Sequence, residues 1–183
     1  MAKPEAVIFD IGNVLIEWQP ERFFDAIMGP KDRARMFAGI DLHDMNDRID
    51  RGAPFRQTVY DWADRYPEWA DKIRLWHDNW ADIAAPAISH SVQLLGALRR
   101  ANVPVFVLSN IGVETMEIAR STYPFLSGFD RIYVSGAMKL AKPDPQIFAM
   151  VEADCRIAPD RLLFVDDRQE NIEAAAARGW QVH

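Results

Sequence analysis

The sequence predicts an α/β protein in which a parallel sheet is covered by helices on both faces, with a helical subdomain inserted after the first strand. Two features carry this prediction. Short, continuously apolar runs alternate with segments of helical periodicity, and such runs are typical of strands that are buried on both faces. One long segment near the N-terminus interrupts the alternation and contains no convincing strand. Together these features indicate a doubly wound, Rossmann-like core of three layers that carries an insertion.

The apolar runs that we expect to form strands each end in small or polar residues. They span 6–10, 103–110, 131–135 and 161–167, with 180–182 as a candidate fifth strand. Asp144 followed by Pro145 is typical of a helix N-cap and first helical position, and Gly179 is typical of the residue after a helix C-terminus. The helices expected between the strands span 88–98, 113–122, 145–150 and 168–178.

The inserted segment holds most of the tryptophans. Pro54 and Pro67 stand where two of its helices are expected to begin. Two apolar series follow them at helical spacing: Phe55, Val59, Trp62 and Tyr66, then Trp69, Ile73, Trp76 and Trp80. This spacing predicts a helix–helix core, with the alternative that one or two rings face a ligand. We therefore expect an α/β core over 1–17 and 86–183 and a helical subdomain over 18–85.

The composition restricts the function classes. Of the 183 residues, 49% are apolar and 26% are charged, and the net charge of −6 speaks against nucleic acid or an anionic membrane as a partner. Cys155 is the only cysteine and forms no internal disulfide, which favours a reducing cytoplasm. No apolar run approaches the ~18 residues of a membrane span, and the first strand begins too early for a signal peptide. The oligomeric state (monomer or homodimer) and a further element after His183 are left open.

Polar residues follow the expected strands at the point where each strand ends. Ligands bind beyond the carboxyl ends of the strands in open parallel sheets, so these residues are candidates for a site. They are Asp10, Ser109, Asn110, Lys142, Asp166 and Asp167. One such residue is more often a turn or a cap, but the set in this order favours a common site.

The set fits phosphoryl transfer. Asp10, Asp166 and Asp167 offer oxygen ligands that suit Mg²⁺, which would neutralise phosphate charge and let a carboxylate approach phosphorus. Lys142 adds a positive charge, and Ser109 with nearby backbone N–H groups can hold phosphate oxygens. An aspartate is an accepted nucleophile that forms an aspartyl-phosphate.

Four segments, in order, resemble the motifs of the haloacid dehalogenase superfamily of hydrolases: FDIGNVL, VFVLSN, KPDPQIF and LLFVDDRQENIEAA. The resemblance spans nearly the whole chain, and the insertion stands where this family carries a small helical cap. The match is to the FDxGxV phosphatase-like branch, which includes a bacterial glucose-1-phosphate phosphatase. It implies a Mg²⁺-dependent phosphohydrolase that acts on a small phosphorylated metabolite, such as a sugar phosphate, through an aspartyl-phosphate.

The resemblance also implies a role for each residue that matches a motif. Asp10 would be the nucleophile and a Mg²⁺ ligand, with the Gly12 carbonyl as a second ligand. Lys142 would steady the phosphate and the nucleophile. Lys139 is the competing lysine, but Lys142 directly precedes proline, as in the family motif.

The acidic pair and the phosphate contacts complete the implied site. Asp167 would contact the metal directly, and Asp166 would act through water or pair with Lys142. The expected contacts to the substrate or its phosphate are Ser109, Asn110, Lys142, Gly12, Asn13 and His43.

Gly12 is the departure from the family pattern. Typical family phosphatases carry aspartate there, which protonates the leaving alcohol and then activates water; such help is usually worth ~10²–10⁴-fold. Three outcomes stay open: a phosphatase with a substituted acid or an easier leaving group, a metal-independent 2-haloacid dehalogenase that uses the same nucleophile, or a non-catalytic phospho-ligand binding protein. The dehalogenase is disfavoured because Asp166 and Asp167 would face a departing halide without a metal.

The polar stretch 39–52 is a candidate source of the missing acid. His43 is its obvious titrating residue, and Asn46 and Arg48 are candidates for binding substrate. The alternative is a solvated turn between two helices. The physiological substrate is not predicted.

Overall fold

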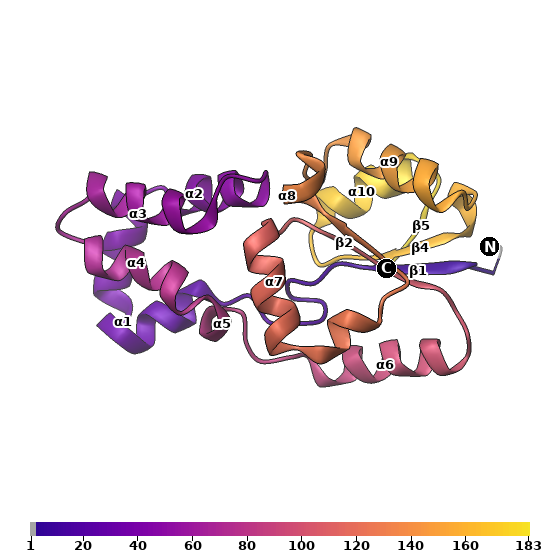
Figure 1. Ribbon diagram of the computed structural model, residues 1–183, viewed down its shortest axis with the longest axis horizontal. Coiled ribbons are helices and arrows are strands. Elements are labelled where there is room, and N and C mark those ends of the chain that lie inside the picture. The colour runs from indigo at the N-terminus through magenta and orange to yellow at the C-terminus, as the bar shows by residue number, and fades with distance from the viewer. Residues whose placement is uncertain (1–2) are drawn as a thin grey trace.

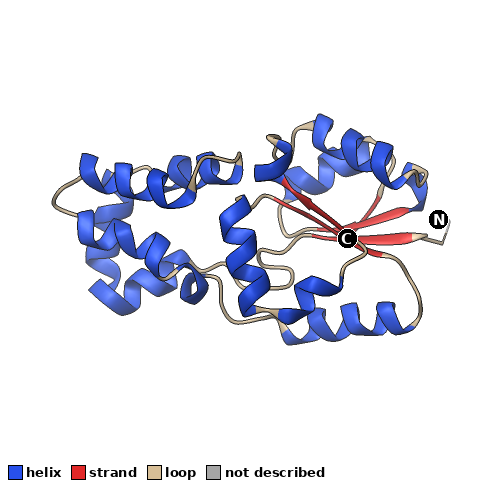
Figure 2. Ribbon diagram, viewed as in Figure 1, coloured by secondary structure: helices blue, strands red, loops and turns tan. Residues whose placement is uncertain are grey.

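The computed structural model describes residues 3–183 and confirms the α/β prediction (Figures 1 and 2). Five parallel strands form a sheet in the order β3-β2-β1-β4-β5. The strands are β1 (Ala6–Phe9), β2 (Val105–Ser109), β3 (Arg131–Val134), β4 (Leu162–Val165) and β5 (Gln181–Val182). The candidate fifth strand is therefore present as β5. Because β1 pairs in parallel with both β2 and β4, its carboxyl end lies beside the carboxyl ends of both neighbours.

Helices cover both faces of the sheet, which explains why the central strands β1, β2 and β4 are apolar apart from Ser109 at the end of β2 (Figure 2). Alternate residues of β1 point to opposite sides: Val7 and Phe9 belong to one buried cluster, and Ala6 and Ile8 belong to the other. The first face carries α6 (Ser89–Arg100), α7 (Val113–Thr122) and the 3-10 helix η1 (Pro124–Gly128). The second face carries α9 (Pro145–Cys155) and α10 (Gln169–Ala177), with α8 (Ser135–Met138) after β3 and η2 (Pro159–Arg161) before β4.

A separate group of helices follows β1, and we call α1–α5 the helical cap (left in Figure 1). They are α1 (Pro20–Gly39), α2 (Leu42–Asp50), α3 (Phe55–Arg65), α4 (Ala70–Asp78) and α5 (Trp80–Ile83). The two predicted apolar series pack inside the cap, with Phe55, Val59, Trp62, Ile73, Trp76 and Trp80 buried. The predicted helix–helix core is thus confirmed. Within residues 3–183, no helix combines the length and the apolar character that crossing a membrane requires.

The alternative of a solvated turn at 39–52 was wrong, because residues 42–50 form α2. The Asp41 side chain accepts a hydrogen bond from the Asp44 backbone N–H at 2.9 Å and caps the helix. One face of α2 is buried through Leu42, Met45 and Ile49. Because this stretch contains many charged residues, its apolar periodicity was not recognised in the sequence.

Two other helix bounds differ from the predicted ones. The helix that begins at Pro145 extends to Cys155, where Arg156 ends it in a left-handed conformation with φ 57°. The helix expected at Pro67 begins at Ala70, after a turn. Helix ends depend on local hydrogen bonds that apolar periodicity does not report.

Candidate active site

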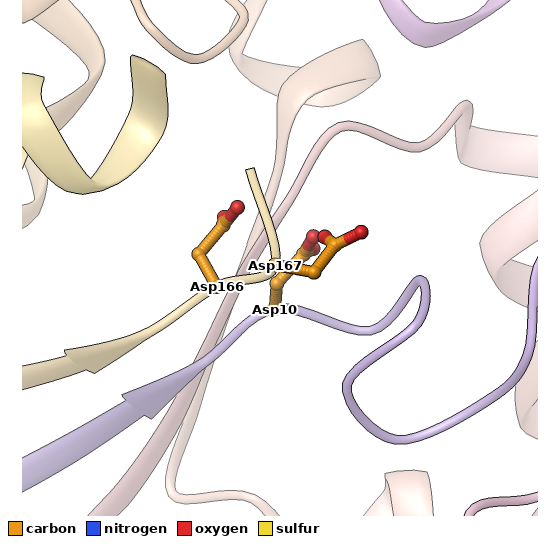
Figure 3. A group of neighbouring side chains, drawn as sticks. All are labelled: Asp10, Asp166 and Asp167. Carbon is orange, nitrogen blue, oxygen red and sulfur yellow. The ribbon is translucent and has the colours of Figure 1, made fainter. Parts of the chain in front are cut away.

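The carboxyl ends of β2, β1 and β4 bring the predicted residues together. Parallel pairing places Phe9 opposite Val165, so Asp10 and Asp166 follow at adjacent strand ends. The Asp10 backbone N–H donates to the Val165 carbonyl at 2.9 Å, which continues this register to the tip. Ser109 ends β2 on the other side of β1. Figure 3 shows the acidic side chains at the ends of β1 and β4 directed toward the same side.

Lys142 lies between two of these acids. Its Nζ is 3.1 Å from Asp10 Oδ1 and 2.5 Å from Asp166 Oδ2, and its side chain is 1% exposed. A buried ammonium group requires partners of this kind, because burying an unpaired charge is costly. Lys139 is exposed and donates to the Gly52 carbonyl at 3.0 Å. The structure therefore brings Lys142, and not Lys139, to the acids.

Asp10 occupies a buried position beside Lys142, and burial raises the pKa of its carboxyl group. The charge of Lys142 lowers this pKa, and the charge of Asp166 raises it further. Hydrogen bonds from the Ser109 hydroxyl and from the Ile11 backbone N–H, the latter at 2.7 Å, favour the ionised form. The outcome is a desolvated carboxylate in a fixed orientation, which suits a nucleophile or a metal ligand.

The three acids have the chemistry of a divalent-cation site. Asp10, Asp166 and Asp167 each offer an oxygen, and these atoms lie within 4.8 Å of one another. Such donors suit Mg²⁺, which takes few protein carboxylates and retains water. Both Asp166 oxygens already accept hydrogen bonds from the protein, whereas Asp167 is exposed. Asp10 and Asp167 therefore fit direct contact with the cation, and Asp166 fits a supporting position.

Asn171 belongs to this site but was not singled out from the sequence. Its Nδ2 donates to Asp166 Oδ1 at 2.9 Å, and the Arg168 backbone N–H donates to the same oxygen at 2.9 Å. Asn171 is buried near the start of α10. A polar residue five positions after an acid at a strand end, on the first turn of a helix, was the signal that could have found it.

Two predicted phosphate contacts use their side chains to orient other site residues. The Asn110 amide donates to the Lys142 carbonyl at 2.9 Å and accepts from the Lys142 backbone N–H at 2.8 Å. Asn13 has a left-handed backbone with φ 52°, and its Nδ2 donates to Asp167 Oδ2 at 3.2 Å. Asn110 thereby fixes the segment that carries the buried lysine, and Asn13 orients the exposed acid.

Gly12 lies in the loop after β1, and packing does not explain why its side chain is absent. A Cβ built there would meet Trp18 Cβ at 3.8 Å, an ordinary van der Waals contact. An aspartate at this position would therefore meet no clash at its first carbon. A clash at the Cβ is therefore not the reason for glycine at this position.

The site opens into a cavity of about 210 Å³ between the sheet and the helical cap. Asp10, Ser109, Lys142 and Asp167 line one part of it, and Trp18, Trp76 and Trp80 line another part together with smaller apolar residues. Trp76 and Trp80 are also buried in the cap core. Rings of the helix–helix core thus also line the cavity, and whether they contact a ligand stays a prediction.

One side of α2 contributes a polar stripe to this cavity, made of His43, Asn46, Asp47 and Asp50. His43 is exposed. Arg48 is not in the stripe: it pairs with Asp44 Oδ2 at 2.9 Å and its guanidinium lies 5.1 Å from the centre of the Trp62 ring.

Asp50 is the most unusual member of the stripe, and sequence reasoning missed it. It is partly buried, and burial, followed by the charges of Asp47 and Asp10, raises its pKa well above the usual range. The spacing of the stripe, at positions i, i+3, i+4 and i+7, was visible in the sequence, but only as part of a segment that had not been assigned to a helix.

Comparison with known proteins identifies the family of this chain and several relatives. The model of the haloacid dehalogenase-like hydrolases matches residues 4–179. A D-ribitol-5-phosphate phosphatase from Bacteroides thetaiotaomicron is 21% identical over 197 residues, which cover 96% of this chain and 88% of the relative. A sesquiterpene phosphatase from Aspergillus oryzae is 26% identical over 184 residues, which cover 96% of this chain and 86% of the relative.

A solved structure shares the fold. A haloacid dehalogenase family enzyme from Bacteroides thetaiotaomicron, in complex with magnesium and inorganic phosphate, superimposes with a TM-score of 0.75 at 22% identity. The match covers 100% of this chain and 93% of that structure. The fold, the strand-end site and the match over residues 4–179 lead to one conclusion: the chain belongs to the haloacid dehalogenase-like hydrolase family.

Proposed function

We propose that this chain is a Mg²⁺-dependent phosphohydrolase that acts on a small phosphorylated metabolite, with a sugar phosphate as one candidate. The arrangement around Asp10 carries the proposal. A buried carboxylate stands at a strand end, a buried lysine lies 3.1 Å from it, and Asp167 offers a second oxygen for a cation. The phosphatases among its relatives support the reaction class.

In this proposal Asp10 attacks phosphorus with a carboxylate oxygen, and an aspartyl-phosphate forms as the ester P–O bond breaks. Lys142 and the Ser109 hydroxyl hold phosphate oxygens next to Asp10 and balance part of their charge. A Mg²⁺ ion held by Asp10, Asp167 and the Gly12 carbonyl would supply further positive charge for the phosphate. Water then hydrolyses the intermediate, releases phosphate and restores Asp10.

The remaining contacts are proposed from their positions. Gly12, Asn13, His43 and Asn110 all line the same cavity as Asp10. We assign them to the substrate or its phosphate. His43, on the helical cap, is the member of this set placed to contact the part of the substrate beyond the phosphate.

Removal of Mg²⁺ is expected to abolish hydrolysis of para-nitrophenyl phosphate, and excess Mg²⁺ should restore it. Without a cation, Asp10, Asp167 and the phosphate dianion repel one another. The measurement is nitrophenolate release with EDTA and after back-titration. Chloride release from a 2-chloro acid that EDTA leaves unchanged would instead show a dehalogenase. Mg²⁺ binding without turnover of any phosphate ester would show a binding protein.

We further propose that residues 1–17 and 86–183 form the hydrolase core and residues 18–85 form a cap that closes over the substrate; Met1 and Ala2 lie outside the described residues. The junction between the two is tight. The Asp50 carbonyl accepts a hydrogen bond from the Ser135 hydroxyl at 2.5 Å. A Cβ at Gly112 would lie 2.8 Å from Ile49 Cγ2 and 3.1 Å from the Ile49 carbonyl oxygen.

Gly112→Ala is therefore expected to push α2 away from the core and to raise KM for a phosphate ester several-fold. Overpacking of this kind typically costs ~1–3 kcal/mol. Here the cost destabilises the arrangement in which the cap is closed against the core. The matched control is Gly39→Ala, where a Cβ would meet nothing within 4 Å. Equal KM values for Gly112→Ala and the wild type would contradict a closed junction during turnover.

A further inference from the structure

Of the acids that the helical cap contributes to the cavity, Asp50 is held in a fixed position by hydrogen bonds. Asp50 is the last residue of α2 and lines the cavity together with Asp10. Its side chain is held by protein donors: Asn46 Nδ2 donates to Asp50 Oδ2 at 2.8 Å, and the Gly112 backbone N–H also donates to the carboxylate. Its backbone carbonyl is bonded to Ser135 of the core. Asp50 therefore holds its place relative to the strand ends whenever the cap is docked.

This position is unfavourable for an acid whose only role is structural. The C-terminal end of a helix disfavours negative charge, and Asp50 forms no ion pair among residues 3–183. The charges that act on its carboxyl group are those of Asp47 and Asp10, both negative. The basic side chains around it have other partners, since Arg48 pairs with Asp44 and Lys139 bonds to the Gly52 carbonyl. A partly buried acid that faces other acids is typical of a functional group.

Because residue 12 is glycine, the site lacks a general acid and base at that position. Hydrolysis of an alkyl phosphate requires a proton for the departing oxygen and a base for the attacking water, and Gly12 supplies neither. Within the cavity, His43 is exposed and Asp47 is exposed. Asp50 is the partly buried acid of the stripe, and burial favours its protonated form.

We propose that Asp50 is the general acid and base of this enzyme and replaces the acid missing at Gly12. This inference rests on the proposed phosphohydrolase function. As the Asp10 oxygen bonds to phosphorus and the ester P–O bond breaks, the Asp50 carboxyl proton passes to the departing oxygen and yields the alcohol. The Asp50 carboxylate then takes a proton from water, whose oxygen attacks phosphorus, breaks the acyl-phosphate bond, and frees phosphate and Asp10.

The test compares two leaving groups in Asp50→Asn. Asparagine keeps the size and can still accept from Gly112, but it carries no transferable proton. An alkyl leaving group such as that of n-propyl phosphate requires protonation, whereas para-nitrophenolate departs without it. We expect kcat/KM for n-propyl phosphate to fall by ~10²–10⁴-fold, and kcat/KM for para-nitrophenyl phosphate to change by a few-fold at most. Retained aryl phosphate activity shows at the same time that the variant folds.

Stability and a control variant sharpen the test. Because Asp50 is an unpaired, partly buried acid, Asp50→Asn should melt at a higher temperature than the wild type at neutral pH. Asp44→Asn removes a charge from the same helix but lies outside the cavity, in a surface pair with Arg48. It should leave the ratio of the two kcat/KM values unchanged.

Three results would overturn the inference. They are an equal fall for both substrates in Asp50→Asn, no fall for either, or the selective fall in Asp47→Asn instead. A wild-type protein that hydrolyses neither ester would overturn the proposed function, and this inference with it. The first three require an active wild type, so the two failures are distinguishable.

A second variant tests the same role by restoring an acid where Asp50 has been removed. The backbone at Gly12 has room for a Cβ, so Gly12→Asp restores the acid at the position used by typical family phosphatases. We expect Gly12→Asp to recover alkyl phosphate turnover in the Asp50→Asn background by at least tenfold. A double variant that stays as slow as Asp50→Asn, although Gly12→Asp alone is active, would assign Asp50 a role other than proton transfer.

Discussion

Asp10→Asn is expected to lower hydrolysis of para-nitrophenyl phosphate in Mg²⁺ by ~10⁴-fold or more, since loss of a catalytic nucleophile typically has effects of this size. The amide is a poor nucleophile and a poor cation ligand, so both proposed roles of Asp10 are lost at once. The measurement is the single-turnover rate of nitrophenolate release. Acid quenching should trap phosphate covalently on the wild type and not on the variant.

The stability of this variant should change in the opposite direction. Burial raises the pKa of Asp10, so the ionised carboxylate opposes folding. This cost builds up as the pH rises from the ordinary aspartate pKa to the raised folded-state pKa, and it is fully present above the latter. In the absence of Mg²⁺ at neutral pH, Asp10→Asn should therefore melt at a higher temperature than the wild type. That combination separates a catalytic acid from one that the fold requires.

The matched control for Asp10 is an acid at the opposite end of the sheet. Asp130 Oδ2 accepts a hydrogen bond from the Val105 backbone N–H at 2.8 Å, where β2 begins. Asp130→Asn retains an acceptor and should keep full activity. Wild-type turnover in Asp10→Asn, or equal losses in the two variants, would remove Asp10 as the nucleophile.

The core and the acids at the strand ends could be predicted because they depend on local sequence. A strand buried on both faces must be apolar throughout, and a parallel sheet places the polar residue after each strand at one edge. Asp10 and Asp166 lie 156 positions apart, yet the register of β1 with β4 makes them neighbours. For residues that directly follow strands, the order of the motifs along the chain is sufficient to predict that they meet at one site.

Asp50 could not be predicted in this way, because its environment is created by contact between the cap and the core. The hydrogen bond from Ser135 to Asp50 joins residues 85 positions apart, and no periodicity reports it. The same holds for Asn110, whose sequence suggests phosphate binding but whose amide bonds to the backbone of Lys142. Sequence patterns identify which residues lie at the carboxyl edge of the sheet. The role of each of these residues depends on its tertiary contacts.

Lys142→Met is expected to lower both activity and stability. Methionine matches the length of the stem but leaves Asp10 and Asp166 facing each other without the cation, with Asp166 fully buried. Removing one partner of a buried pair typically costs ~3–5 kcal/mol, and loss of a positive group beside developing charge typically costs ~10²–10³-fold in kcat. The measurements are urea unfolding and hydrolysis of para-nitrophenyl phosphate.

The loss of stability in Lys142→Met should depend on pH. Burial and the charge of Asp166 raise the pKa of Asp10, and only the charge of Lys142 and hydrogen bonds oppose this. Without Lys142, Asp10 therefore binds a proton still more readily in the folded state than in the unfolded chain. The stability deficit should be largest at neutral pH and should shrink as the pH falls and Asp10 becomes protonated. Lys139→Met removes the exposed lysine that bonds to Gly52 and should change activity little. If Lys139→Met showed the larger loss of activity, Lys139 would be the phosphate-binding lysine, although it lies away from the acids.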